Sequence, residues 1–523
     1  MRRLSVFSIA VVAALATASA QPAFAVDTVN TKKLRDAVTV GGILSHERAL
    51  QRIANQNGGT RASGTPGFAA SVSYVKKTMK AAGYTVKEQP FTFPFYRELA
   101  PAELSQVSPT ATDYETATFD YSGTGDVTGT VVATKDIIVP PTATPSSTSG
   151  CEAADFVPAS ATQPQVALIQ RGTCTFAIKA ANAEAAGYDA VIIFNEGQPG
   201  RDELLTGTLG GITGIPVVGV SFADGAALYA ATQAGPVTVH VVTSTENVPV
   251  ATTSNVIAET KGGDPNKVLV VGAHLDSVTK GPGINDNGSG SATLLETAEQ
   301  ISALKLAPRQ KIRFIFYGAE ESGLLGSEHY VANLTDTQLG KIFANLNFDM
   351  LGSPNYVRFV YDGDGSSLGV AGPPGSAQIE KVFNDYYAGQ GLATDPTAFD
   401  GRSDYGPFIE AGIPAGGLFS GAEGEKTAAQ AAVYGGTALQ PYDSCYHQAC
   451  DTVNNLNTKA LFELGDGAVH AIWTLAKSKT GLYEDGSFST GADAAAKAKA
   501  AKAAAKAKAA KVAPVYEGHQ AVR

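Results

Sequence analysis

Imidazole and carboxylate side chains follow several short apolar segments of this sequence. His274 comes shortly after the apolar segment 268–271, and the adjacent Glu320 and Glu321 come shortly after segment 314–317. In an open α/β sheet, functional groups collect at the carboxyl ends of the strands. Two adjacent carboxylates are costly to bury without compensation, and a bound dication removes that cost. The pair therefore indicates either a metal site or, if it stands alone, a solvated acidic loop.

Two aspartates near His274 extend this pattern. Asp276 lies two residues after His274 and could hold the second ring nitrogen, which would fix the tautomer of the histidine. Asp286 stands in the glycine-rich segment 283–290, where aspartate also favours turns and helix N-caps. The same segment could suggest a phosphate loop, but it lacks the lysine of a Walker motif.

Two later segments complete the set of candidate ligands. Asp349 follows another apolar stretch, and Tyr446 and His447 lie between Cys445 and Cys450. A disulfide there would stiffen a loop that carries two functional side chains. Imidazole and carboxylate ligands suit zinc or a similar divalent ion. One shared carboxylate with two further ligands for each ion would give a two-metal site, with the ions roughly 3.5–4 Å apart.

The elements that must position these residues follow an α/β pattern. Segments 268–271, 289–304 and 314–317 are predicted to form a strand, a helix and a strand, which is a βαβ unit with a parallel sheet. Segment 68–82 has apolar residues at helical spacing, and segment 85–93 alternates like a strand. We expect a mixed, largely parallel central sheet flanked by helices.

Composition divides the rest of the chain. Residues 105–248 are rich in Thr, Val, Gly and Pro, and we interpret them as a β-rich insert in a discontinuous domain formed by 30–104 and 249–482. The tail, residues 485–523, is of low complexity and contains a run of only Ala and Lys at 494–511. The tail is predicted to be a solubilising or removable segment, with a cationic anchor as the alternative.

The N-terminus and the cysteines indicate export. Residues 1–25 have the basic start, apolar stretch and small-residue end of a cleaved secretory signal peptide, with an N-terminal membrane anchor as the alternative. Four cysteines fit an oxidising compartment. Proximity favours the pairs Cys151 with Cys174 and Cys445 with Cys450 among three connectivities, and neither pair has the spacing of a structural zinc site. We therefore expect an extracellular protein with no membrane span.

Charge and hydrophobicity exclude some classes of protein. The formal charge is −10, from 39 basic and 49 acidic residues, which argues against a general nucleic-acid-binding protein. Hydrophobic residues make up 44% of the chain, which is too many for a mostly disordered protein.

The order of the motifs resembles the M28 metallopeptidase family, most closely its secreted zinc aminopeptidases of the Streptomyces type. The matching strings are GAHLDSV, GINDNGSG, GAEESGLLGS, NFDM, DGRSDYGPF, GIPAGGLF and CYHQACDT, which lie in this order between about residues 270 and 455. The earlier string RASGTPG also resembles a stretch of the family. The resemblance implies the zinc exopeptidase fold and two Zn²⁺ ions per chain, although cobalt or manganese could occupy the same ligands.

The resemblance also implies a role for each residue. Asp286 would bridge both zinc ions, with His274 and Asp349 completing one site. Glu321 and His447 would complete the other site. The remaining implied roles are the general base Glu320, the oxyanion hydrogen-bond donor Tyr446, the substrate-pocket residues Arg402 and Phe419, and the disulfide Cys445–Cys450.

The insert resembles a protease-associated (PA) domain. The likeness is carried by residues 166–197, which read as a strand, a cysteine-containing turn, a helix and a second strand. The resemblance implies a non-catalytic part that restricts substrate access, binds partners or shields the enzyme.

The function that follows is a monomeric metallo-aminopeptidase. It would hydrolyse the first peptide bond of peptides or proteins and prefer large hydrophobic N-terminal residues. A related exopeptidase or cyclase of different specificity is one alternative, and a non-catalytic PA-containing binding protein is another. A structural Ca²⁺ is a further expectation from the many surface carboxylates, although no segment has EF-hand-like spacing.

Overall fold

The computed structural model describes residues 26–483 and 485–488 of the chain. The predicted signal peptide, residues 1–25, and most of the predicted tail, from residue 489 onward, lie outside the described residues. The helices are α1 Lys32–Arg35, α2 Val40–Gln56, α3 Pro66–Ala81, α4 Phe176–Ala185, α5 Phe222–Ala234, α6 Gly290–Ala303, α7 Leu325–Ala332, α8 Asp336–Leu339, α9 Ser376–Gly389, α10 Gly406–Glu410, α11 Ala428–Tyr434 and α12 Thr458–Lys477. The strands are β1 Thr85–Ser108, β2 Thr112–Tyr114, β3 Ala117–Thr118, β4 Gly125–Ala133, β5 Gln165–Gln170, β6 Ala190–Phe194, β7 Val217–Val220, β8 Thr238–Glu259, β9 Asp264–His274, β10 Gln310–Tyr317, β11 Ile342–Phe348, β12 Phe359–Tyr361, β13 Asp395–Thr397 and β14 Ala415–Phe419.

All the strands of the described chain belong to one 14-stranded sheet, whose main path is β13-β12-β14-β11-β9-β10-β8-β4-β5-β6-β7-β3. Strands β9, β10, β11 and β14 run parallel to their neighbours among themselves, and so do β4, β5, β6 and β7. Strand β8 is antiparallel to both β10 and β4 and therefore joins the two parallel groups. The predicted mixed, largely parallel sheet is confirmed.

The predicted βαβ unit is present as β9, α6 and β10. These strands read as continuous apolar runs because both faces of the sheet are covered. On one face, Leu294 and Leu464 belong to the core formed with α2, α3, α6, α9 and α12. On the other face, Tyr330 and Phe408 of α7 and α10 pack against Val270 and Ile315.

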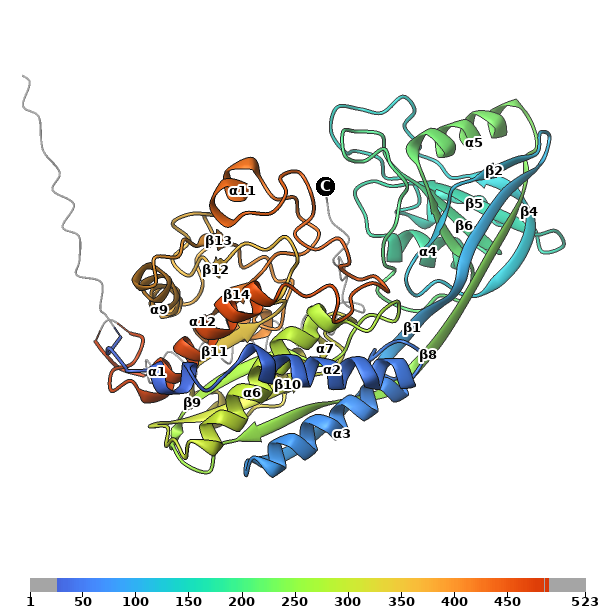
Figure 1. Cartoon of the computed structure of the whole chain (residues 1–523). Helices are drawn as coiled ribbons and strands as arrows, with labels where there is room; N and C mark the ends of the chain where they lie inside the picture. The colour runs from blue at the N-terminus through green and yellow to red at the C-terminus, as the bar shows by residue number, and fades with distance from the viewer. Residues whose placement is uncertain (1–25, 484, 489–523) are drawn as a thin grey trace, which may run out of the picture.

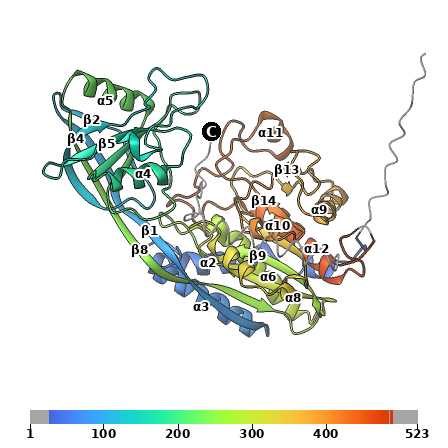
Figure 2. The ribbon, with the colours of Figure 1, turned by 180° about the vertical axis from the view of Figure 1, so that it is seen from behind.

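Two long strands join the part that carries the predicted ligands to the inserted part (Figure 1). β1 and β8 pair antiparallel along nearly their whole length, from Thr85 opposite Glu259 to Ser108 opposite Thr238. The view from behind shows the same two strands running between the two parts (Figure 2). The segment predicted as a strand at 85–93 thus continues to Ser108, because β8 supplies a partner for every stretch of it. The predicted domain boundaries near residues 104 and 248 fall inside these strands, and the division itself stays a prediction.

The inserted part has its own apolar cores on the two faces of β4 to β7. Val166, Ile192 and Val239 belong to one of them, and Ile169, Ala180 and Val217 to the other. The disulfide Cys151–Cys174 ties the loop after β4 to the turn that precedes α4. Among the described residues, no helix combines the length and the apolar character needed to cross a bilayer.

Lys179 on α4 is a buried cation in the inserted part. Its side chain is fully buried, and Nζ donates to the main-chain oxygen of Ser149. Burial lowers the pKa of Lys179 to about 8, although the charges of Glu196 and Asp155 oppose this shift. The folded state therefore releases this proton at a lower pH than the unfolded state does.

We predict that the Lys179→Met substitution alters how stability depends on pH. Between about pH 8 and 10.4, the unfolded chain keeps the lysine protonated while the folded chain does not, so the wild-type free energy of unfolding gains from rising pH. Urea unfolding across this range should give a less positive slope for Lys179→Met than for wild type. The exposed Lys87→Met is the control, and equal slopes for Lys179→Met and wild type would contradict the prediction.

Candidate metal centre and active site

The parallel strands β9, β10 and β11 bring the predicted ligands to one edge of the sheet. Tyr317, the last residue of β10, lies opposite His274, the last residue of β9. β11 lies on the other side of β9, and Asp349 follows its last residue, Phe348. The carboxyl ends of three neighbouring strands therefore supply His274, the Glu320 and Glu321 pair, and Asp349.

His274 lies between two carboxylates. Its Nε2 is 3.2 Å from Asp286 Oδ1 and 3.2 Å from Asp349 Oδ1, and the side chain is almost completely buried. The other ring nitrogen, Nδ1, is 3.1 Å from the main-chain oxygen of Asp276 and 3.7 Å from Asp276 Oδ1. Asp276 thus contacts the histidine as expected, but its closest atom is the main-chain oxygen instead of the carboxylate.

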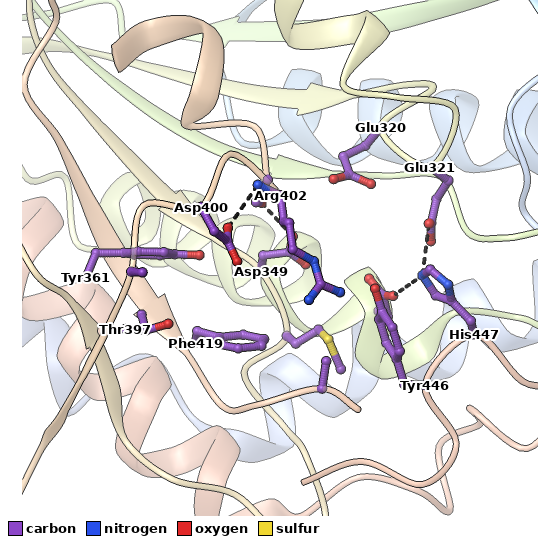
Figure 3. Close-up of a pocket in the computed structure, with 15 residues that line it drawn as sticks. Glu320, Glu321, Asp349, Tyr361, Thr397, Asp400, Arg402, Phe419, Tyr446 and His447 are labelled. Atoms are coloured by element: carbon purple, nitrogen blue, oxygen red, sulfur yellow. Dashed lines mark hydrogen bonds and ion pairs between the residues drawn. The ribbon is translucent and has the colours of Figure 1, made fainter. Parts of the chain in front are cut away.

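His447 occupies an equivalent place on the other side of Asp286. Its Nε2 is 3.2 Å from Asp286 Oδ2 and 3.1 Å from Glu321 Oε2 (Figure 3). The disulfide Cys445–Cys450 closes the short loop that carries it. Asp286 therefore directs one carboxylate oxygen toward each histidine.

The histidines and carboxylates of this group shift one another's pKa values. Burial lowers the pKa of His447, but the carboxylates of Glu321 and Asp286 outweigh this effect and raise it to about 10. Burial also opposes protonation of His274, yet the charges of Asp349 and Glu320 raise its pKa well above the usual range. Despite burial, the two histidines hold the pKa of Asp286 far below its usual range.

The donor set fits divalent zinc. His274, Asp286 and Asp349 have ligand atoms close enough to share one ion, and so do Asp286, Glu321 and His447. Imidazole nitrogens and carboxylate oxygens are ligands that zinc takes in proteins. Glu321 Oε1 is buried and has no hydrogen-bond partner among the described residues, which leaves an acceptor to be satisfied.

Glu320 and Tyr446 lie beside these groups. Glu320 Oε2 is 4.0 Å from His274 Nε2, and burial raises the pKa of Glu320 well above the usual range. Figure 3 shows the Glu320 and Glu321 side chains directed toward different parts of the pocket, with Glu321 facing His447. The Tyr446 ring stacks on His447 with 3.8 Å between ring centroids.

A pocket opens next to the histidines and carboxylates. Its lining includes Tyr361, Met350 and Phe419, and the Phe419 ring stacks on Phe359 at 5.9 Å. Arg402 also lines the pocket and pairs with Glu423 at 2.7 Å. The pocket therefore combines an acidic end with an apolar wall.

Known proteins are similar to this chain in sequence and in architecture. Residues 255–472 match the family described as Peptidase family M28, and residues 109–228 match the PA domain. An aminopeptidase of Pseudomonas aeruginosa is 46% identical over 450 residues, which cover 85% of this chain and 82% of the relative. The chain belongs to peptidase family M28. The prediction of an M28 aminopeptidase that carries a PA domain is confirmed.

One further relative and one solved structure are also similar to this chain. Leucine aminopeptidase 2 of Arthroderma otae is 40% identical over 461 residues, covering 87% of this chain and 88% of the relative. The solved structure of BSAP, a zinc aminopeptidase from Bacillus subtilis, matches with a TM-score of 0.59 and 26% identity, covering 86% of this chain and 99% of that one.

Sequence reasoning missed several residues that hold this M28 site in place. Ser403 donates to Asp349 Oδ2 at 2.6 Å. Asp451 accepts from the main-chain amides of Asn285 at 2.8 Å and Asp286 at 3.0 Å, and so fixes the turn that carries the shared aspartate. Ser403 lies in the string DGRSDYGPF and Asp451 in the string CYHQACDT. The resemblance to the family therefore covered both residues, but it did not indicate their supporting roles.

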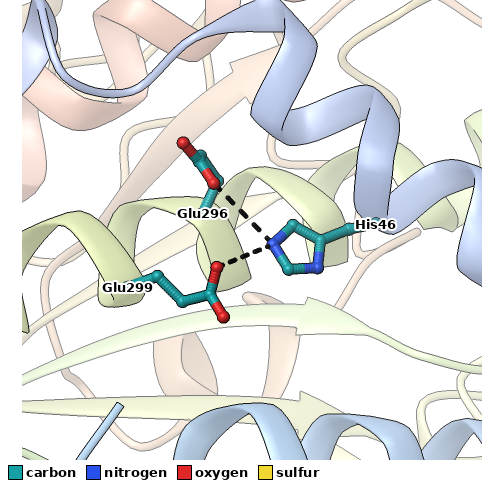
Figure 4. Close-up of side chains that lie close together, drawn as sticks. All are labelled: His46, Glu296 and Glu299. Carbon is teal, nitrogen blue, oxygen red and sulfur yellow. Dashed lines mark ion pairs between the residues drawn. The ribbon is translucent and has the colours of Figure 1, made fainter. Parts of the chain in front are cut away.

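A second histidine group lies outside the pocket. His46 on α2 faces Glu296 and Glu299 on α6 at 3.8 and 3.4 Å, and Tyr74 contacts its other ring nitrogen at 2.6 Å (Figure 4). Burial lowers the pKa of His46, although the charge of Glu296 opposes this shift. The group connects α2 to α6, the helix that begins just after the turn with Asp286.

Arg61 is a further missed residue and lies under the same turn. It is fully buried, and its guanidinium donates to the main-chain oxygens of Leu275, Pro282 and Gly283. These carbonyls belong to the segment between His274 and Asp286. Arg61 therefore supports the backbone between His274 and Asp286.

We predict that Arg61→Met destabilises the enzyme strongly. The substitution leaves the carbonyl oxygens of Leu275 and Pro282 without their donor, whereas that of Gly283 still accepts from the amide of Gly288 at 3.0 Å. Each buried unsatisfied group costs about 1–3 kcal/mol. Urea unfolding should show a free energy of unfolding lower by at least about 2 kcal/mol. The exposed Arg48→Met is the matched control and should change it by less than about 0.5 kcal/mol. A loss as small for Arg61→Met as for the control would contradict the role.

Proposed function

We propose that this M28 aminopeptidase holds two zinc ions that share Asp286. Support comes from one observation above all: the two oxygens of Asp286 each lie 3.2 Å from the Nε2 of a different histidine. Asp349 would complete the site with His274, and Glu321 the site with His447. When bound, zinc lowers the pKa of a coordinated water to about 7 and polarises the peptide carbonyl.

The chain's own groups would move the proton and stabilise the developing charge. Glu320 accepts a proton from the attacking water and passes it to the amine of the leaving peptide. Tyr446 lies beside His447 and donates a hydrogen bond to the oxyanion.

The pocket supports cleavage at the first residue of a peptide. The surplus of carboxylates at its acidic end attracts a free ammonium group, which the main chain of a peptide carries only at its N-terminus. Phe419, Met350 and Tyr361 form an apolar wall that suits a large hydrophobic N-terminal side chain, and Arg402 lies at the same opening. The relative from A. otae is a leucine aminopeptidase, which is consistent with this preference.

The enzyme would work as a secreted monomer. The two disulfides among the described residues fit an oxidising compartment, as do residues 1–25 if they are a cleaved signal. The PA domain would be non-catalytic and would restrict which substrates reach the pocket.

We predict that purified enzyme releases p-nitroaniline from leucyl-p-nitroanilide. A chelator should abolish this activity, and zinc should restore it, because the histidine and carboxylate side chains alone supply no Lewis acid. An N-acetylated leucyl substrate is the control and should not be cleaved. Activity that survives complete metal removal, or equal cleavage of the acetylated substrate, would refute the proposal.

We also predict that Glu320→Gln separates catalysis from metal binding. It should retain both zinc ions and lower kcat by about 10²–10⁴-fold, because only the proton carrier is lost. Asp286→Ala is the contrasting variant and should lower the zinc content to one ion or none, measured by elemental analysis. Loss of zinc in Glu320→Gln would make Glu320 a ligand, and two ions retained in Asp286→Ala would exclude the shared role.

A further inference from the structure

A histidine and two glutamates meet between helices α2 and α6, outside the substrate pocket. His46 Nε2 lies 3.4 Å from Glu299 Oε2 and 3.8 Å from Glu296 Oε2. Figure 4 shows both carboxylates directed toward this one ring nitrogen. One ligand atom of each residue lies within 4.8 Å of the other two, and the group shares no residue with the proposed zinc pair.

Two regular helices bring these side chains together. Glu296 and Glu299 are three residues apart on α6, so their side chains lie on the same face of the helix. Gly42 of α2 leaves room for one of them, because a Cβ there would lie 2.3 Å from Glu296 Oε1. His46 stands about one turn further along α2, so its ring reaches the same two carboxylates.

Tyr74 on α3 orients the histidine ring. Its hydroxyl oxygen lies 2.6 Å from His46 Nδ1. When Nδ1–H donates to this oxygen, the lone pair of Nε2 is directed at the two carboxylates. Histidines that bind a metal usually donate their other N–H to an oxygen partner, which fixes the tautomer and the plane of the ring. The contact with Tyr74 therefore prepares Nε2 to act as a ligand.

The group lacks a partner of permanent positive charge. In the described part of the chain, neither glutamate forms an ion pair with a lysine or an arginine, and both face His46 instead. Burial lowers the pKa of His46 below its usual value of 6.5 and raises the pKa values of Glu296 and Glu299. An imidazole that is mostly neutral near pH 7 does not compensate two carboxylates, and a bound dication would do so.

We propose that His46, Glu296 and Glu299 bind one zinc ion. Zinc takes imidazole nitrogen and carboxylate oxygen at about 2.0–2.2 Å, so two ligands of a tetrahedral ion lie about 3.4 Å apart. The distances of 3.4 and 3.8 Å from His46 Nε2 are close to this value. The nitrogen donor favours zinc over calcium and magnesium, which prefer oxygen ligands.

The oxygens of the group leave a place for the ion. Gln300 donates to Glu296 Oε1 at 3.0 Å, so that Oε2 is the oxygen that faces His46. Glu299 is partly exposed, with 39% of its side chain accessible, whereas His46 and Glu296 are buried. Water would therefore complete the coordination from the side of Glu299.

The ion would join α2 to α6 and so support the turn that carries Asp286. α6 begins at Gly290, four residues after that aspartate. Glu47, next to His46 on α2, packs against the same turn, since a Cβ on Gly288 would lie 2.7 Å from its Oε2. Zinc at this place would stabilise the two helices and take no part in hydrolysis.

The test measures zinc bound to the full chain after equilibration with micromolar zinc chloride. By elemental analysis, the wild type should hold one zinc ion more per chain than His46→Gln or Glu299→Gln. Tyr74→Phe removes only the hydroxyl that orients the ring and should weaken binding of this ion by about 10–100-fold, measured by competition with a chelator. His240→Gln is the matched control, because His240 pairs with Asp126 at 2.7 Å outside this group, and it should hold as much zinc as wild type.

Equal zinc contents in wild type, His46→Gln and Glu299→Gln would overturn the site. Wild-type zinc affinity in Tyr74→Phe would overturn the orienting role of the tyrosine. Urea unfolding in the presence of a chelator checks that each variant is folded. The proposed pair at Asp286 is then counted in the His46→Gln variant, where this site is empty. A failure of that pair would lower zinc content and activity without changing the difference of one ion, so the two failures remain distinguishable.

Discussion

The architecture of this enzyme depends on the placement of one carboxylate between two imidazoles. Asp286 contacts His274, which ends a strand at the centre of the sheet, and His447, which stands in a disulfide-closed loop 161 residues further along the chain. Neither histidine alone would justify burying an aspartate at this position. The surrounding structure therefore has to hold three distant segments in register, and Asp451 and Arg61 do so by hydrogen bonds to the main chain around Asp286.

The sheet supplies this register through strand pairing. β9, β10 and β11 are parallel neighbours, so a residue placed just after any of them arrives at the same edge. Helices on both faces bury the strands, and α6 starts directly beyond the turn with Asp286. The fold thus turns three separate local features of the sequence, each an apolar run followed by an acidic or imidazole residue, into one compact cluster.

Much of this arrangement could be predicted, because the signals are local. The runs at 268–271 and 314–317 are apolar, and His274 and the Glu320–Glu321 pair follow them within a few residues. The supports could not be derived in this way, since Asp451 and Asn285 are 166 residues apart and no periodicity relates them. The backbone conformation of Ala319, Met350 and His447 could not be predicted either. All three residues have a left-handed backbone, with φ of 53°, 54° and 58°, and none of them is a glycine, the residue that usually indicates this conformation.

The long antiparallel pairing of β1 with β8 determines how the inserted part is attached to the rest of the fold. Arg97 lies opposite Glu246 near the middle of this ladder, and pairing continues on both sides of that point. Seen from the part of the chain that carries the active site, residues 98–245 together form the loop of a single β-hairpin. A short turn in its place would preserve the connectivity of the sheet. The same hydrogen-bonded ribbon that makes the PA domain removable in principle also makes its attachment stiff, because it is joined by two paired strands instead of two flexible linkers.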